Sequence, residues 1–401
     1  MNELFFKLTK LLLDYSSYWR TSPFKEPTPV WALTENKLCE WLLTLSEEEL
    51  EFLQADDERL YKALTSHFAV ANEIAELVNI PKSMATKVVH PNPFWHLTIP
   101  GRKAEQIEYF SASLGPMQGS VVEWCAGKAH LGRYLCGLHP ITVNSLEIDA
   151  ALVHAGSALV KTPLTNSSSL TLHQCDVLTP SAKQFLHQDS HIMALHACGE
   201  LHVKLLQGAA EKQVKRISLA PCCYHLIAEN SYQALSTPAI NSALHLSQEE
   251  MRNAVRQWVT SPASVQRKRQ KMQAWRLGFD SLQRELHGVD TYLPIPTLPE
   301  KLLHNTFAAF CQHLATLKDL SIPPSFNFAN YFAHYEAIGV QRFYQASRFE
   351  LVRMLFRRPL EYWLALDRMI FLTERGYNTT IVQFCPTHLT PRNLLIDATL
   401  D

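Results

Sequence analysis

Two patterns of apolar and polar positions alternate along the chain. Residues 1–80 place apolar side chains at the three- and four-residue spacing of amphipathic helices, as in ENKLCEWLLTLSEEELEFLQ. Within this stretch, Ser46 followed by Glu49 predicts a capped helix start. A proline-rich linker covers 81–103, and short apolar runs then alternate with helical stretches over 104–235. This alternation favours an α/β domain with a parallel sheet and helices on both of its faces.

The pattern changes again after residue 235. Residues 236–375 are mostly helical, with proline-rich interruptions. The last helix of this block is expected to begin near Pro359 and to stop at Gly376. The terminal segment 376–401 contains two short apolar runs, NTTIVQF and LLIDA, joined by a turn. The sequence therefore predicts an N-terminal helical domain, a Rossmann-like sheet, a helical insertion and a C-terminal β-hairpin that completes the sheet.

The segment EWCAGKAHLG, residues 123–132, is a small-residue loop between a predicted strand and a predicted helix. Such a loop directs backbone N–H groups toward a ligand. In the dinucleotide register G-x-G-x-x-G, Ala129 places a methyl group where a pyrophosphate would approach, which weakens the case for NAD. S-adenosylmethionine (SAM) has no pyrophosphate, and its sites favour a strand-end acid followed by small residues at alternate positions. Glu123, Cys125, Gly127 and Ala129 have this spacing.

Two more acids stand at the ends of the next predicted strands. Glu147 could accept hydrogen bonds from both ribose hydroxyls, although NAD sites use an acid in a similar place. Asp176 could receive the adenine amino group. Three acids at successive strand ends indicate a SAM-binding sheet. The predicted cofactor contacts are Glu123, Cys125, Gly127, Lys128, Ala129, His130, Leu131, Glu147, Asp176, Val177 and His196.

Two further loops are rich in reactive side chains. LHACGE carries His196 and Cys198, and APCCYH carries Cys222, Cys223 and His225. Methyl transfer requires an oriented acceptor and, for a hydroxyl, a base that removes its proton, a role open to histidine. His196 and His225 are therefore candidate bases.

The cysteines of these loops allow other roles. Cys222 or Cys223 could attack a pyrimidine ring as a thiolate, or both could be small packing residues. A metal site made by Cys198, the vicinal pair and His225 is not expected, because adjacent cysteines rarely both reach one ion. The nine cysteines of the chain include no C-x-x-C pair.

Four motifs in order, EWCAGKAHLGRYL, ALHACGEL, APCCYH and TPRNLLI, resemble a methyltransferase family with a CAGKGHL-type loop. That family includes tRNA 2′-O-methyltransferases with small zinc fingers and other methyltransferase-like proteins. The resemblance covers about 100–235 and 376–398, and it implies a class I SAM-dependent methyltransferase with a seven-stranded sheet. Ala129 replaces a family glycine, residues 102–106 match the family's lysine-lysine-x-His-Glu stretch only loosely, and no zinc-finger cysteines precede the domain.

The charge pattern bears on the partners. The formal net charge is −1, so the whole chain has no electrostatic footprint for nucleic acid or membrane. Two local blocks, 252–276 and 342–358, combine cations with aromatic residues, which suits phosphates and unstacked bases. Solvated helix faces with their aromatic residues in the core are the alternative. The cations are Arg252, Arg256, Arg267, Lys268, Arg269, Lys271 and Arg276 in the first block and Arg342, Arg348, Arg353, Arg357 and Arg358 in the second.

These features together predict a SAM-dependent methyltransferase that acts on RNA, with tRNA as a candidate. A methyltransferase for a protein or small molecule, or a SAM-binding interaction protein without catalysis, are the alternatives. No apolar run approaches the ~18 residues of a membrane span. The first residues carry charges and lack a cleavage site, so we expect a cytoplasmic protein with reduced thiols.

Overall fold

The structure, a computed structural model, describes residues 1–84, 95–99, 101–160, 168–255, 263–322 and 328–400. The chain forms two compact units, and each of them combines segments that are distant in the sequence. Unit 1 contains Met1–Asp14, Glu76–Arg256 and Arg357–Asp401, whereas unit 2 contains Tyr15–Ala75 and Gln257–Phe356.

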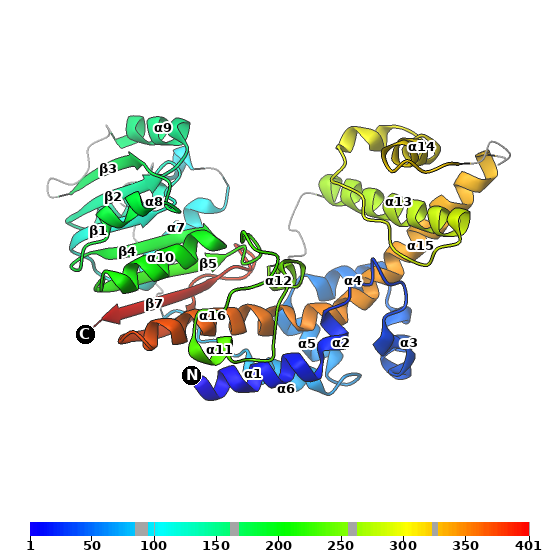
Figure 1. Cartoon of the computed structure of the whole chain (residues 1–401), viewed down its shortest axis with the longest axis horizontal. Coiled ribbons are helices and arrows are strands. Elements are labelled where there is room, and N and C mark those ends of the chain that lie inside the picture. The colour runs from blue at the N-terminus through cyan, green and yellow to red at the C-terminus, as the bar shows by residue number, and fades with distance from the viewer. Residues whose placement is uncertain (85–94, 100, 161–167, 256–262, 323–327, 401) are drawn as a thin grey trace. The chain divides into compact units, whose positions relative to one another are not determined.

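Unit 1 is built on a seven-stranded sheet with the order β3-β2-β1-β4-β5-β7-β6 (Figure 1). The first five strands are parallel, and β7 runs antiparallel to both β5 and β6. The strands are β1 Gly119–Trp124, β2 Ile141–Glu147, β3 Ser169–Gln174, β4 His191–Cys198, β5 Arg216–Cys222, β6 Tyr377–Gln383 and β7 Leu394–Leu400. This arrangement confirms the predicted Rossmann-like class I sheet and its C-terminal hairpin.

Helices cover both faces of this sheet. Alternate residues of β1 point to opposite sides, so Val121 and Val122 belong to different apolar clusters. The Val121 cluster includes side chains of α7 (Lys103–Leu114) and α8 (His130–Leu138). The Val122 cluster includes side chains of α10 (Glu200–Glu211) and of α16 (Arg357–Thr373). Burial on both faces explains why the parallel strands read as nearly continuous apolar runs.

The first helix packs against α16 within unit 1. α1 (Asn2–Asp14) places the ring of Phe5 on Trp363, with ring centroids 5.2 Å apart. Trp363 Nε1 donates a hydrogen bond to Thr9 Oγ1 at 2.8 Å. The remaining helices of this unit are η2 (Trp95–Thr98), α9 (Ala150–Val160), η3 (Pro180–Phe185), α11 (Thr237–Ile240) and α12 (Gln248–Ala254).

Unit 2 is helical. Trp275, Phe307, Phe310 and Tyr335 form the centre of its apolar cluster. Its helices are α2 (Ser16–Trp19), η1 (Val30–Leu33), α3 (Asn36–Thr44), α4 (Glu47–Gln54), α5 (Asp57–Leu64), α13 (Ala263–His287), η4 (Glu300–His304), α14 (Phe307–Leu317) and α15 (Phe328–Leu355); α6 (Val70–Leu77) spans its boundary with unit 1. The capping box of Ser46 and Glu49 is present at the start of α4, as predicted.

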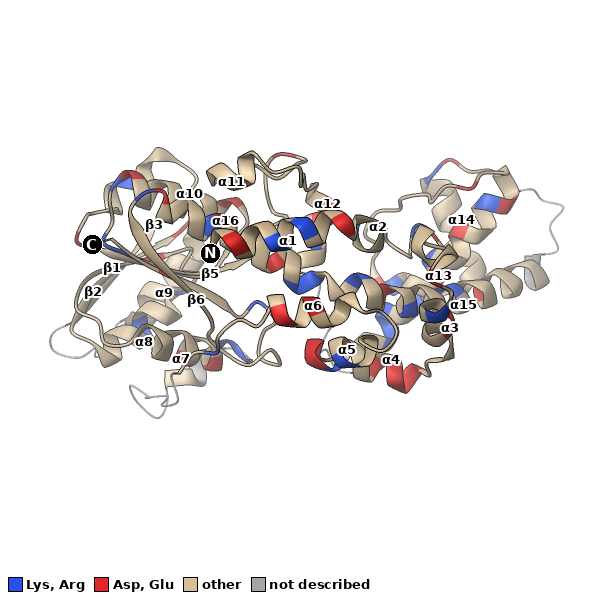
Figure 2. Cartoon of the chain, turned by 90° about the horizontal axis from the view of Figure 1, so that it is seen from below, with Lys and Arg blue, Asp and Glu red and all other residues tan. Residues whose placement is uncertain are grey.

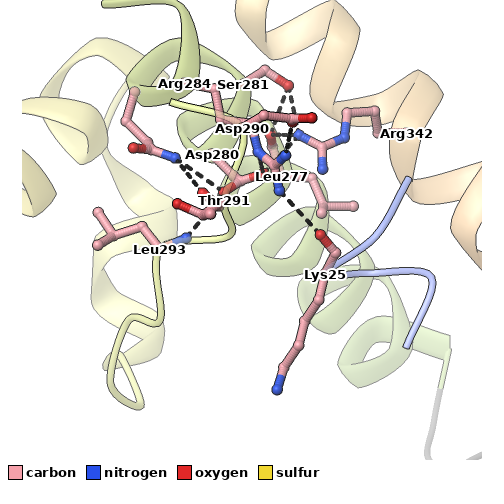
Figure 3. A network of polar contacts seen from close by, with 10 residues as sticks. Lys25, Leu277, Asp280, Ser281, Arg284, Asp290, Thr291, Leu293 and Arg342 are labelled. Carbon is pink, nitrogen blue, oxygen red and sulfur yellow. Dashed lines mark hydrogen bonds and ion pairs between the residues drawn. The ribbon is translucent and has the colours of Figure 1, made fainter. Parts of the chain in front are cut away.

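A buried carboxylate organises part of unit 2. Asp280 is 1% exposed and accepts hydrogen bonds from Arg284 Nε at 2.8 Å and from an Arg342 guanidinium nitrogen at 2.9 Å. The same carboxylate accepts from the backbone N–H of Leu293 (Figure 3). A buried charge needs such partners, because an unpaired one is strongly destabilising.

The two units divide the chain differently from the predicted domains. The predicted 1–80 domain is split after Asp14 and after Ala75, and the predicted 236–375 insertion is split after Arg256 and after Phe356. Helical spacing identifies an apolar face, but it does not indicate which distant helix covers that face. The last helix begins at Arg357, slightly before Pro359, and ends at Thr373, before Gly376. The predicted linker 81–103 falls partly outside the described residues, and none of the helices described here is long and apolar enough to cross a membrane.

Candidate active site

The loop after β1 has a strained, tightly coiled backbone. Cys125, Gly127 and Ala129 all have left-handed φ angles, at 57°, 60° and 52°. A left-handed conformation costs a residue with a side chain roughly 1–2 kcal/mol, so the surrounding structure must hold it. Ala126 N donates to Leu146 O at 2.9 Å, which fastens the loop to the end of β2. A side-chain atom added at Gly127 would meet nothing within 4 Å, so the space above the loop is open to a ligand.

Glu123 lies beneath this loop, with its carboxylate turned into the domain. The residue is 4% exposed, and its Oε2 accepts from Ser145 Oγ at 2.7 Å and from Gly132 N at 3.2 Å. The carboxylate thus joins the first turn of α8 to β2. This orientation does not fit the predicted direct contact between Glu123 and the cofactor. The spacing of the motif places Glu123 at the strand end but does not indicate which way its side chain turns.

Replacing Glu123 by glutamine is expected to remove a pH dependence of stability. Burial raises the pKa of Glu123 to about 7 in the folded chain, from 4.5. The resulting stabilisation is fully present below about pH 4.5 and is lost as the pH rises through about 7, on the order of 2–3 kcal/mol. Urea unfolding at a series of pH values should show this decline in the wild type and a flatter curve in Glu123→Gln. Parallel curves would mean that Glu123 ionises normally in the folded chain.

The two other predicted acids lie at the carboxyl ends of β2 and β3. Glu147 ends β2, and its Oε2 accepts from Gly127 N at 2.8 Å while Oε1 accepts from Asp149 N at 3.1 Å. Asp176 follows β3 and accepts from Leu178 N at 2.9 Å. Burial, together with the smaller effects of the charges of Glu147, Cys198 and Asp176, raises the pKa of the Cys125 thiol to about 12. The structure therefore brings the acids of β2 and β3 together around the loop.

The predicted cofactor contacts differ in accessibility. Lys128 is exposed, and Cys125, Gly127, Glu147, Asp176 and His196 are partly exposed. Ala129, His130, Leu131 and Val177 are buried, and only their backbone or a small edge can face a ligand. The pKa of His130 is lowered to about 4, mainly by burial and to a smaller extent by the positive charges of Lys103, Arg133 and Lys128. His130 is therefore uncharged near neutral pH.

His196 is held by contacts that fix its ring. It lies near the end of β4 with a φ of 71°, where the pairing of β4 with β5 is irregular. Its Nε2 is 2.7 Å from Gln106 Oε1, and Gln106 Nε2 in turn donates to Leu389 O at 3.1 Å. Because the amide is oriented by Leu389, its oxygen faces the imidazole, and Nε2 carries the proton. The lone pair of Nδ1 is then available to another group.

Burial also controls the charge of His196. Together with the smaller effects of the charges of Lys103 and Arg392, burial lowers the pKa of His196 to about 4. The ring is therefore neutral near pH 7. Gln106 and Leu389 were not among the predicted site residues. Gln106 lies in the stretch 102–106 that loosely matches the motif of related methyltransferases, and this was the only signal for it.

The APCCYH loop separates its members into buried and accessible positions. Cys222 is 1% exposed, and the neighbouring thiols Cys198 and Cys223 are the main causes that raise its pKa. Cys223 is half-buried, and its pKa is lowered through hydrogen bonds with Cys198 and Cys222. A thiolate nucleophile would therefore be Cys223 rather than Cys222. His225 is half-buried, and its Nδ1 has no hydrogen-bond partner among the described residues.

Tyr224 packs inside the domain and does not offer a surface for base stacking. It is fully buried, and the guanidinium of Arg368 lies 4.7 Å from its ring centroid. Arg368 Nε also bonds His202 Nε2 at 2.8 Å, and His202 contacts the edge of Tyr224. Together these contacts fix the APCCYH loop to α10 and α16.

The two basic blocks have different environments. In the second block Arg342, Arg348 and Arg353 are bonded within unit 2, and Arg358 is bonded within unit 1 to Glu361 and Asn393. Its aromatic residues Phe343, Phe349 and Phe356 are buried. The predicted RNA contact by 342–358 therefore lacks the exposed side chains that it requires, because ion pairs and apolar contacts inside each unit use them.

The first block keeps exposed cations but not exposed aromatic residues. Trp275 is 3% exposed and belongs to the core of unit 2, while Trp258 and Arg256 lie outside the described residues. The exposed cations of α13 are Arg267, Lys268, Arg269 and Lys271. Figure 2 marks the Lys and Arg positions along the ribbon in blue. Lys268 pairs with Glu300, and Lys271 lies over the ring of Trp275. Of the RNA contact predicted for 252–276, the exposed cations of α13 therefore remain, without exposed aromatic residues beside them.

Comparison with known proteins identifies the class. Residues 102–230 match a family model described as a methyltransferase domain, which is less than half of the chain. A search of curated proteins gives no match.

Solved structures give similarities of low score. One is an RNA methyltransferase of Pyrococcus horikoshii whose assignment is itself provisional, with 17% identity, a TM-score of 0.24, and coverage of 38% of this chain and 73% of that chain. Another is the cyclopropane synthase MmaA2 of Mycobacterium tuberculosis, with 9% identity, a TM-score of 0.27, and coverage of 84% and 96%. A third is a geranyl diphosphate methyltransferase in complex with sinefungin, with 13% identity, a TM-score of 0.23, and coverage of 41% and 65%. These similarities say nothing about the acceptor.

The sheet order and the family match define residues 102–230 as the core of a class I methyltransferase domain. The chain is a SAM-dependent methyltransferase, as the loop and the strand-end acids predicted. The class of methyl acceptor and the narrower family with the CAGKGHL-type loop remain predictions.

Proposed function

We propose that this methyltransferase acts on RNA, and that tRNA is a candidate acceptor. The observation that carries the proposal is a division of charge along the carboxyl edge of the sheet. Glu147 ends β2 and Asp176 follows β3, whereas cations act on His196 near the end of β4 and on His225 after β5. Burial is the main cause that lowers the pKa of both histidines, and the charges of Lys103 and Arg392 at His196 and of Arg252 and Arg392 at His225 lower it as well.

The acidic half fits the cofactor. The Glu147 carboxylate suits ribose hydroxyls, Asp176 suits the adenine amino group, and the open space above Gly127 allows close approach to the loop. When bound, SAM supplies an electrophilic methyl group on its sulfonium centre. In open α/β sheets the ligand lies beyond the carboxyl ends of the strands, so the cofactor residues and His196 share one edge.

The cationic half fits an anionic acceptor. Arg252 is exposed on α12, and Lys103 and Arg392 are partly exposed. Cations placed beside a reactive centre attract phosphates and set the position of the acceptor. Within unit 2, α13 carries exposed cations of a kind that suits phosphates. The resemblance of four motifs to tRNA-methylating relatives supports the same class of acceptor. Nδ1 of His196 is available to take a proton from the acceptor group, while Gln106 holds the ring.

The direct test uses modified nucleosides. RNA from cells that lack the gene is digested and compared with wild-type RNA by mass spectrometry, and the purified protein with labelled SAM is then added to the RNA of the deficient cells. We expect one methylated nucleoside to be missing from the deficient cells and restored by the protein. Label transfer to protein or to small molecules, with unchanged nucleosides, would overturn the assignment of the acceptor.

Arg252→Ala is expected to weaken RNA binding without changing SAM affinity. Loss of one phosphate contact should make the slope of log affinity against log salt shallower by about one. Lys7→Ala is a matched control, because Lys7 is an exposed cation of the same unit that pairs with Glu3 on α1. Affinities measured by fluorescence anisotropy across a salt series decide the matter. An unchanged slope in Arg252→Ala would remove Arg252 from the RNA surface.

A further inference from the structure

Three cysteine sulfurs converge at the carboxyl ends of β4 and β5. Cys198 Sγ lies 3.4 Å from Cys222 Sγ, and Cys223 Sγ completes a set in which all three atoms lie within 4.8 Å of one another. Cys222 is buried, whereas Cys198 and Cys223 are half-buried. The cluster is therefore shielded on one side and reachable on the other.

The backbone builds this cluster from two strands. Cys198 pairs directly with Cys222 in the parallel register of β4 and β5, which places their side chains together. Cys223 has a φ of 46°. In a regular strand its side chain would point to the face opposite Cys222, but a left-handed residue breaks that alternation. This is how two adjacent cysteines reach the same point, which the sequence had led us not to expect.

The neighbouring loop is locked against the cluster. Gly199 N donates to Cys222 O at 3.0 Å, and Leu226 N donates to Cys223 O at 2.8 Å. A side-chain atom at Gly199 would lie 2.0 Å from Leu226 O, so only glycine fits there. These contacts hold the three sulfurs in place without help from a flexible segment.

We propose that Cys198, Cys222 and Cys223 bind one thiophilic metal ion, for which Zn²⁺ is the natural probe. Three thiolates at about 2.3 Å from a tetrahedral zinc ion lie about 3.8 Å from one another. The sulfurs here are compatible with this spacing, because Cys198 Sγ and Cys222 Sγ are 3.4 Å apart and all three lie within 4.8 Å of one another. Binding releases the thiol protons to solvent as three metal–sulfur bonds form. The fourth position is open to water.

This site goes beyond methyl transfer to RNA and does not depend on it. The three ligands with an open fourth position correspond to the arrangement of reactive rather than purely structural zinc sites. It would place a Lewis acid at the end of β5, on the acceptor side of the sheet. Metal content is measured without any acceptor, so failure of the RNA assignment and failure of the metal site are distinguishable.

The test measures metal in the full-length protein. The protein is purified under reducing conditions, supplied with Zn²⁺, freed of excess metal and assayed by plasma mass spectrometry. We expect one zinc ion per chain in the wild type and its loss in Cys198→Ser and Cys223→Ser. Cys175→Ser is the matched control, because Cys175 is a cysteine of the same unit outside the cluster, and it should keep the metal.

A second measurement avoids the risk that variants misfold. Wild-type protein titrated with Co²⁺ should develop the intense thiolate-to-cobalt absorption of a tetrahedral sulfur site, and Zn²⁺ should displace it. Absence of both stoichiometric zinc and the cobalt spectrum would overturn the proposal. So would a disulfide between Cys198 and Cys222 that persists in the protein purified under reducing conditions. Loss of zinc from the Cys175 variant as well would also contradict it, because binding would then not be specific to the cluster.

Discussion

Replacing His196 by asparagine is expected to lower turnover on RNA by about two to four orders of magnitude, the usual contribution of a general base. Asparagine tolerates the left-handed backbone of this position better than most residues, so the variant should fold. Its side chain cannot take a proton from the acceptor. SAM affinity, measured by calorimetry, should remain close to that of the wild type because the change affects proton transfer.

Variants of Gln106 test separately whether the orientation of His196 matters for turnover. It positions the ring of His196 and holds the proton on Nε2. Gln106→Leu should therefore lower kcat with little change in KM, whereas Gln106→Asn should restore part of the loss. A merely structural role would lower stability without this split.

His225 is the competing candidate base. If His225→Ala loses turnover by this amount and His196→Asn retains full turnover, the general base is His225 and not His196. If a serine at Cys223 alone abolishes turnover and the wild type forms a covalent adduct with 5-fluoropyrimidine RNA, a thiolate attacks the base instead. Full activity in all of these variants would remove both loops from the chemistry.

Replacing Glu147 by alanine is expected to reduce SAM affinity at least tenfold, which corresponds to about 1.4 kcal/mol. The reason is the loss of charge-assisted hydrogen bonds to the ribose, each worth about 1.5–3 kcal/mol. In the structure the same carboxylate accepts from Gly127 N and Asp149 N, so it also stabilises the loop. The affinity for SAM and for its demethylated product should fall together in isothermal calorimetry.

Glu147→Gln separates the two contributions of this carboxylate. Glutamine keeps one oxygen that can accept from Gly127 N, but it loses the negative charge. Affinity should then fall less than in the alanine variant, and the thermal stability should stay near that of the wild type. A folded alanine variant that binds SAM normally would show that the ribose lies elsewhere.

Several features of the fold could be read from local patterns. The alternation of short apolar runs with helices over 104–235 and the two terminal runs predicted the sheet and its hairpin, because period and run length are set by the backbone geometry of each element. The capping box at Ser46 depends only on residues three apart, and the structure contains it. The acids Glu147 and Asp176 were identified by their positions at strand ends, and the structure places both at one edge.

Contacts between distant segments were not readable in the same way. The arginines of 342–358 resembled an RNA surface, but Arg342 is bound by Asp280, sixty-two positions away. Arg353 donates to the carbonyl of Trp19, and Arg358 to the side chain of Asn393. An arginine in a sequence is equally compatible with a phosphate, a buried carboxylate or a free carbonyl, so only the folded chain decides its partner.

The sequence by itself determined the class of fold, the small-residue loop between β1 and α8 and the order of the strand-end acids, because each follows from spacing along a few consecutive residues. The tertiary structure alone decided which way these side chains turn and which groups they contact. It turned Glu123 under the loop, oriented His196 through Gln106, which lies ninety residues earlier, and gathered three sulfurs from two strands. The physical reason is that side-chain direction depends on strand register, on left-handed residues such as Cys223, and on packing between segments that the sequence keeps far apart.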